Sequence, residues 1–171
     1  MKAGLILRAA FAGAFLTFLA SCESGGVTSG DGFRKQYTVA RTALEEGRYD
    51  VAIRHYQRMI PNAGRAAPRL QLEYAHAQLR AGDYAGARVS AGTLAQEQSG
   101  DARLAALAVA GTAAHELGLA ARQSGDPASA KALLTEAQSA MAEVVNSNPD
   151  LDPLGALSGR LASIKVQLAA L

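Results

Sequence analysis

Apolar and polar positions follow a helical period along most of this chain. From Phe33 onward alanine and leucine dominate, and apolar residues recur three and four positions apart, while aromatic and β-branched residues are sparse. This spacing places apolar side chains on one face of an α-helix, and alanine and leucine both favour helix formation. The pattern therefore predicts an all-α domain over residues 33–171.

A short motif of glycine, tyrosine and alanine repeats within this helical region. Its first copy, Gly47, Tyr49 and Ala52, recurs 35 residues later, and a third, weaker copy has proline at the tyrosine position. The second and third copies are Gly82, Tyr84 and Ala87, and Gly125, Pro127 and Ala130. Repeats of this length are typical of stacked helical hairpins.

Each position of the motif has a local physical reason. The glycines follow helical stretches, where the chain often takes a left-handed conformation that glycine adopts without a Cβ clash. Asp83 and Asp126 stand where a carboxylate can cap the next helix, and Pro127 suits a first helical position, which needs no backbone donor. The alanines stand where a small side chain lets two helices approach closely. The motif thus predicts three antiparallel helix pairs.

The spacing and these residues resemble the tetratricopeptide repeat, a helix–turn–helix unit of about 34 residues. Ala40 and Tyr56 in the first copy and Ala75 in the second also match that pattern. The resemblance covers residues 33–148 and implies a right-handed helical-hairpin solenoid of about three repeats.

The chain departs from the tetratricopeptide pattern in two respects. Gln36, Gln71 and Ala114 stand at the early position that usually holds tryptophan, and Ala91 replaces a bulky residue. The third repeat begins 43 residues after the second, which predicts an overlong first helix at about 101–124. A looser helical-hairpin solenoid is the alternative architecture.

The segment NSNPDLDP, residues 146–153, interrupts the helical pattern. Asp152 and Pro153 can start another helix, which the pattern places at 154–170. Residues 149–171 are therefore predicted to form a connector and a C-terminal capping helix, because a solenoid needs its last apolar face covered.

The first 21 residues have the features of a bacterial secretion signal. Lys2 and Arg8 precede a mostly apolar run, Ala9–Ala20, which is too short to span a bilayer but suits a signal-peptide core. The segment LASC, which ends at Cys22, resembles the lipobox of bacterial lipoproteins and implies that Cys22 carries a diacylglycerol. The alternative is an ordinary signal peptide with an incidental thiol at this position.

Residues 22–32 are rich in glycine and polar side chains, and we expect them to form a flexible tether behind the lipidated cysteine. Two acyl chains suffice for stable membrane anchoring. By resemblance to the sorting rule of enteric bacteria, Glu23 after the cysteine favours the outer membrane, with the domain facing the periplasm.

Charge argues against nucleic acid as a partner. Removing residues 1–21 leaves 15 basic and 15 acidic residues, so the domain is electrically neutral overall. The charges are unevenly placed: residues 33–92 hold 10 basic and 5 acidic side chains, and residues 93–171 hold 5 and 8. Nucleic-acid binding relies on many clustered cations, whereas this distribution predicts a dipolar domain.

No motif of the sequence favours catalysis, a cofactor or a metal. The segment HELGL at 115–119 begins like a zinc-protease helix, but Leu119 stands where the second histidine ligand belongs. The oxygen-rich segment after Asn146 has Leu151 where a calcium loop needs glycine and Leu157 where it needs glutamate. We therefore expect a protein that is not an enzyme.

The tetratricopeptide resemblance implies a binding groove lined by the first helix of each pair. Carried over by repeat position, the groove residues are Arg34, Tyr37, Arg41, Arg69, Leu72, His76, Arg80, His115 and Arg122. Arginine pairs bidentately with carboxylates, so the expected ligand is an acidic peptide segment or a C-terminus of an envelope protein. The alternative is that these arginines only solvate the helices and pair with acids such as Glu45 and Glu73.

Together these features predict a membrane-anchored adaptor that uses helical repeats to bind proteins in a bacterial envelope assembly. By analogy, small repeat lipoproteins of this kind serve in pilus biogenesis and secretion, including tight-adherence pili. The alternatives are a non-catalytic subunit of outer-membrane protein assembly or of a cell-wall enzyme complex, and a structural protein that associates with itself.

Overall fold

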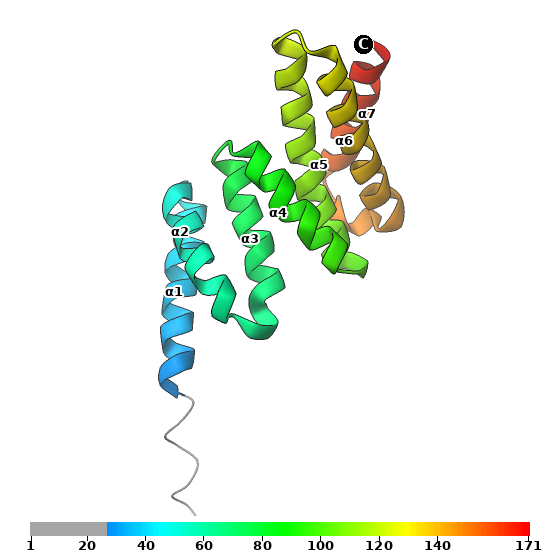
Figure 1. Ribbon diagram of the computed structural model, residues 1–171. Helices are drawn as coiled ribbons and strands as arrows, with labels where there is room; N and C mark the ends of the chain where they lie inside the picture. The colour runs from blue at the N-terminus through cyan, green and yellow to red at the C-terminus, as the bar shows by residue number, and fades with distance from the viewer. Residues whose placement is uncertain (1–26) are drawn as a thin grey trace, which may run out of the picture. The chain divides into compact units, whose positions relative to one another are not determined.

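The computed structural model describes residues 27–171, and this part of the chain contains α-helices and short 3₁₀ helices but no strand (Figure 1). The α-helices are α1 (Val27–Glu45), α2 (Tyr49–Met59), α3 (Ala67–Arg80), α4 (Tyr84–Glu97), α5 (Gly100–Gln123), α6 (Pro127–Ser147) and α7 (Ala156–Ala169). The predicted all-α class is confirmed for these residues. The predicted signal peptide and the lipidation site at Cys22 lie outside the described residues.

The chain forms two units, Met1–Lys35 and Gln36–Leu171. Residues 27–35 of the first unit are described and belong to α1, which begins at Val27. The helix therefore includes residues 27–32, which composition had assigned to the flexible tether. Extending an existing helix by one residue gains a hydrogen bond without a new nucleation step, so polar residues before Phe33 can join it.

The turns of the three predicted helix pairs share one backbone geometry. Each motif glycine has a left-handed φ, and the residue after it donates its amide hydrogen to a carbonyl five residues back, the arrangement of a Schellman turn. The φ angles are 78° at Gly47, 81° at Gly82 and 77° at Gly125. The hydrogen bonds are Arg48 to Ala43 (2.8 Å), Asp83 to Gln78 (3.0 Å) and Asp126 to Ala121 (2.9 Å).

Two of the helices that follow these turns, α4 and α6, also begin alike, whereas α2 begins after Arg48 without a side-chain cap. The carboxylate of Asp83 accepts a hydrogen bond from the Gly86 amide at 2.9 Å, and that of Asp126 accepts one from the Ser129 amide at 3.0 Å. Both aspartates thus cap their helices as the sequence predicted. The motif alanines Ala52, Ala87 and Ala130 are completely buried. The repeat found in the sequence is therefore a repeat of local structure.

Each helix from α2 to α7 packs against the next one along the chain. Figure 1 shows that α3 and α4, and likewise α5 and α6, run in opposite directions. One core cluster joins α3, α4 and α5 through Ala75, Ala91 and Val109. A second cluster joins α5, α6 and α7 and contains Leu134 and Ile164.

The long helix α5 is the centre of this packing. By length and composition alone α5 could cross a membrane, and half of its apolar stretch is buried against other parts of the protein. A Cβ added at Gly118 would lie 2.9 Å from Cγ of Leu134, so only glycine allows α6 to come this close. The predicted overlong first helix of the third pair is confirmed, since α5 has 24 residues and α3 has 14.

The last helix begins slightly later than the sequence predicted. A 3₁₀ turn occupies Pro149–Leu151, and α7 starts at Ala156 instead of Leu154. Asp152 accepts hydrogen bonds from the amides of Leu157 (2.9 Å) and Ser158 (2.8 Å), so the chain needs an extra turn before the helix to bring its amides to that carboxylate.

Candidate functional site

A nearly buried carboxylate, Glu73, lies at the centre of the predicted groove residues of the first two repeats. Its Oε1 accepts hydrogen bonds from the hydroxyl of Tyr37 (2.8 Å) and from Nε of Arg69 (3.1 Å). Its Oε2 accepts one from the hydroxyl of Tyr56 (2.7 Å), and Nη1 of Arg41 lies 3.9 Å away. The carboxylate therefore satisfies its hydrogen-bonding capacity with side chains from α1, α2 and α3.

The two tyrosines are held as hydrogen-bond donors by this environment. Burial raises the pKa of Tyr56 far above its ordinary value, and the hydrogen bond to Glu73 and the charge of that residue raise it further. The pKa of Tyr37 is raised by the same causes in the same order, while Arg69 acts in the opposite direction. Both hydroxyls thus remain protonated and act as donors at neutral pH.

Each arginine beside Glu73 has some N–H groups paired with protein acceptors and others that face solvent. Nε of Arg41 donates to Glu45 at 2.6 Å, and Nη2 of Arg69 donates to the hydroxyl of Tyr37 at 2.9 Å. The side chain of Arg41 is nevertheless 47% exposed and that of Arg69 is 71% exposed. Two of the groove arginines, Arg41 and Arg69, thus pair with Glu45 and Glu73, and this pairing leaves further N–H groups facing solvent.

Two more predicted residues lie beside this cluster on α3. His76 is exposed; the atoms packed around its imidazole lower its pKa, Glu73 raises it, and the charges of Arg41 and Arg80 lower it further. Nη2 of Arg80 donates to the hydroxyl of Tyr49 at 2.9 Å, with the guanidinium 5.5 Å from the ring centre. We call Tyr37, Arg41, Arg69, His76 and Arg80 the arginine surface.

Three of the remaining predicted groove residues are not members of the arginine surface. Leu72 is half-buried and packs beside the core clusters that α3 shares with α4 and α5. Arg34 belongs to the first unit, on α1, and Arg122 is exposed in the last turn of α5.

His115 is buried instead of lining a groove. Only 5% of the residue is exposed, because α7 covers it. Nη1 of Arg160 lies 2.8 Å from Nδ1 of His115, and Oε1 of Gln167 lies 2.8 Å from Nε2. Since an arginine only donates, Nδ1 accepts and Nε2 carries the hydrogen given to Gln167. Arg160 also donates to Glu116 at 2.8 Å.

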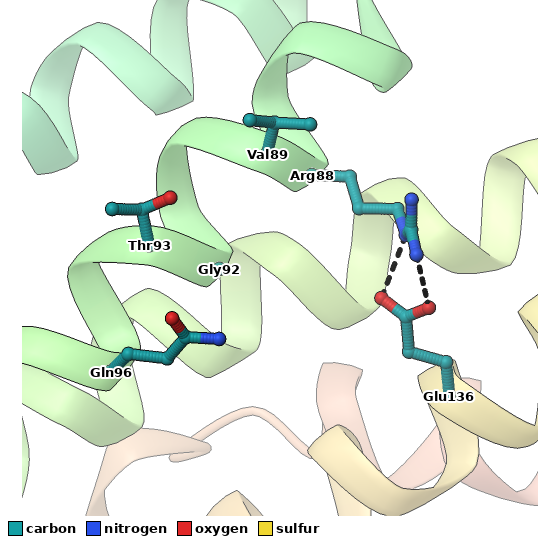
Figure 2. Close-up of a pocket in the computed structure, with 6 residues that line it drawn as sticks. All are labelled: Arg88, Val89, Gly92, Thr93, Gln96 and Glu136. Carbon is teal, nitrogen blue, oxygen red and sulfur yellow. Dashed lines mark hydrogen bonds and ion pairs between the residues drawn. The ribbon is translucent and has the colours of Figure 1, made fainter.

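A pocket that sequence reasoning missed lies between α4 and α6. It has a volume of about 250 Å³ and is open to solvent. Figure 2 shows Arg88 and Glu136 pointing toward each other across it, with two hydrogen bonds of 2.7 Å. Val89 and Thr93 lie along its α4 side, where Gly92 leaves open space. In the sequence, the longer spacing between the second and third repeats was the signal that the geometry of this region is unusual.

Sequence reasoning also missed the central role of Glu73 and the partners of His115. Glu73 follows Arg69 by one helical turn, a spacing that signals the local ion pair. No local signal announces its bond to Tyr37, 36 residues away, or the contacts of His115 with Arg160 and Gln167.

Within the described residues, no group of three or more histidine, cysteine, aspartate or glutamate side chains is arranged to hold a metal ion. The arginine surface offers guanidinium N–H donors held in place by tyrosines and a carboxylate. Such an arrangement can bind anionic groups such as carboxylates. In comparisons with known proteins, no family model, curated protein or solved structure matches this chain.

Proposed function

We propose that this protein is a membrane-anchored adaptor in a bacterial envelope, whose tetratricopeptide-like hairpins hold partner proteins. The observation that carries the proposal is the threefold recurrence of one turn geometry with one buried alanine position, at Gly47, Gly82 and Gly125. Hairpins repeated in this way present extended binding surfaces, and proteins built from them act mainly through protein–protein contacts.

The arginine surface is the proposed binding site, and an acidic peptide segment or a C-terminal carboxylate is its proposed ligand. Arg69 and Arg80 are each fixed by a tyrosine hydroxyl at 2.9 Å while part of the guanidinium faces solvent. A side chain that is already positioned loses less conformational entropy when it binds. Glu73 and Glu45 offset part of the positive charge, so we expect moderate, salt-sensitive affinity.

The proposed setting is a pilus or secretion assembly, with Cys22 as the lipid attachment point at the outer membrane. The alternative setting is outer-membrane protein assembly or a cell-wall enzyme complex, in which the chain would be a non-catalytic subunit. Both settings require the chain to be tethered. Replacing Cys22 by serine should therefore release a folded protein from the membrane fraction, and a variant that still sediments with membranes after a high-salt wash would refute the anchor.

Binding itself is tested with a fluorescent peptide rich in aspartate and glutamate that ends in a free carboxylate. The double variant Arg41→Gln and Arg80→Gln should bind this peptide at least about tenfold more weakly than the unmodified chain, since close charge pairs contribute several kcal/mol at interfaces. Glutamine is used because glutamate at position 41 would repel Glu73.

Arg58 provides the matched control for this experiment. It is exposed on α2, and its Nε donates to the backbone carbonyl of Arg54 at 3.2 Å. The Arg58→Gln variant should bind the peptide normally. Equal affinity of the double variant and the unmodified chain, or a loss confined to Arg58→Gln, would contradict the proposed site.

A further inference from the structure

Helix α7 has one face packed on the protein and another face open to solvent. Leu161 and Ile164 are buried in the cluster with α5 and α6. Val166 is 71% exposed, and Ala162 and Ala169, which lie on the same side of the helix, are exposed as well. A helix that only closed the end of a repeat array would be expected to carry a polar outer face.

Helix α7 contacts α5 through an arginine at the place where α3 contacts α1 through an arginine, although the acceptor differs. Arg69 of α3 donates to the hydroxyl of Tyr37 at 2.9 Å, and Arg160 of α7 donates to Nδ1 of His115 at 2.8 Å. Tyr37 and His115 occupy the same position of the first and third repeats. Arg160 therefore corresponds to Arg69, which places α7 in register with α3.

When α7 and α3 are compared in this register, the residues of one face are buried in both helices, and the residues of the other face are covered in α3 but exposed in α7. Leu161 and Ile164 correspond to Leu70 and Glu73, and all four are buried. The positions that correspond to Ala162, Val166 and Ala169 are Gln71, Ala75 and Gln78. Ala75 and Gln78 are buried and Gln71 is half-buried, whereas the three residues of α7 are all exposed.

The face that is open in α7 is covered in α3 and α5 by the following antiparallel helix. Ala75 of α3 lies in one core cluster with Ala91 of α4. In α5, the equivalent residue Gly118 contacts Leu134 of α6. The covering residues Ala91 and Leu134 are equivalent too. Alanine faces alanine in one pair and glycine faces leucine in the other, so the smaller residue on the first helix faces the larger one on the second.

We propose that the Ala162, Val166 and Ala169 face of α7 binds an amphipathic helix of a partner protein, which completes a fourth helical hairpin. Val166 is larger than Ala75 or Gly118, so the partner helix presents alanine or glycine opposite it. Lys165 is exposed beside this face, and an acidic residue of the partner complements it. This surface is separate from the arginine surface and does not depend on the function proposed above.

Charge favours a different protein over a second copy of this chain. Helix α7 contains no acidic residue, and its other cation, Arg160, is already paired with Glu116. Two α7 helices packed face to face would bring two copies of Lys165 together with nothing to neutralise them.

The test uses a probe with the sequence of α6, the helix that covers α5. The probe is a fluorescent peptide of residues 127–147 with Leu134→Ala, held helical by a hydrocarbon staple between positions 135 and 139, both exposed in α6. The full chain should bind it saturably, with a Kd below about 100 µM. The same peptide with leucine at 134 should bind about tenfold more weakly, because leucine would overpack against Val166.

Variants of the full chain locate the binding face. Val166→Asp should abolish binding without lowering the melting temperature, because the side chain is exposed, and Lys165→Glu should weaken binding severalfold. Val89→Asp is the matched control: Val89 is 64% exposed on α4, and the change in charge is the same. This control should bind like the unmodified chain.

Three results would overturn the proposal. They are no saturable binding of the stapled peptide, equal binding by the unmodified chain and Val166→Asp, or a Val166-dependent dimer in analytical ultracentrifugation, which would assign the face to a second copy. None of these results bears on the arginine surface, because the acidic-peptide assay is read at positions 41 and 80.

Discussion

The contact around Glu73 and the contact around His115 stand at equivalent places in the repeat, but their polarity differs. In the first, the carboxylate of Glu73 accepts from two tyrosines and an arginine across α1, α2 and α3. In the second, the imidazole of His115 accepts from Arg160 and donates to Gln167, and this joins α5 to α7. One repeated backbone thus supports two kinds of contact.

This difference shows which residues are fixed by the hairpin geometry and which can vary between repeats. The turn glycines and buried alanines recur in all three hairpins, because the turn and the close helix packing require them, and a capping aspartate is present in the second and third. The side chains between successive first helices can vary, provided that buried polar groups are satisfied. The Glu73 contact holds exposed arginines in place, and the His115 contact holds a helix whose outer face is apolar.

Removing Glu73 should have the largest effect on stability. Glu73→Ala leaves the hydroxyls of Tyr37 and Tyr56 and the guanidinium of Arg69 without their acceptor, and we expect the free energy of unfolding to fall by about 3 kcal/mol. The control is Glu143→Ala, since its exposed pair with Arg103 is worth at most about 1 kcal/mol. Urea denaturation measures both, and equal losses would mean that Glu73 is no centre of packing.

Replacing the motif alanines by a larger residue tests whether the second and third hairpins are packed in the same way. Ala87→Leu and Ala130→Leu should each lower the free energy of unfolding by about 1–3 kcal/mol, because both sites are completely buried. Ala85→Leu, at an exposed position of α4, should have little effect. Unchanged melting temperatures for both buried sites would refute the repeat register.

Replacing His115 should cost less than replacing Glu73. His115→Ala removes a hydrogen bond from the guanidinium of Arg160 and one to the amide of Gln167, but Arg160 keeps its pair with Glu116 and water reaches both groups in part, so we expect a loss of about 1–2 kcal/mol. Amide hydrogen exchange in α7 should accelerate more than exchange in α3, since the contact joins only α5 and α7. Uniform acceleration across the helices would show that the two contacts are not independent.

The smallest effect concerns the cap of α6 and its pH dependence. Hydrogen bonds from Ser129 lower the pKa of Asp126 below its ordinary value, so the stabilisation is present above about pH 4 and is lost as the pH falls through the lowered pKa. Asp126→Asn keeps an acceptor but removes the titration, so the variant should lose less stability over this range. Identical pH profiles of thermal unfolding would exclude a contribution from this cap.

Local chemistry made much of the fold predictable from the sequence. The spacing of glycine, tyrosine and alanine predicted the turns at Gly47, Gly82 and Gly125 and the burial of Ala87, and the structure confirms them. Boundaries were less accurate: α1 starts before Phe33, because helix extension depends on neighbouring turns and not on composition alone.

The candidate site was only partly predictable. Pairing of Arg69 with Glu73 follows from their spacing on one helix. The burial of His115 does not, because it depends on where α7 packs, and Arg160 and Gln167 are 45 and 52 residues away in the sequence. The exposed face of α7 could not be predicted from the sequence either, because it is recognised only by comparing α7 with α3 in the structure.

The most direct test of the proposed adaptor function is site-specific photo-crosslinking in living cells. A photoreactive amino acid at His76, within the arginine surface, should crosslink the full chain to one envelope protein, and Arg41→Gln with Arg80→Gln should abolish the product. The same group at Val89 should not yield it. No product from position 76, or an equal product in the double variant, would contradict the claim that this surface binds a partner.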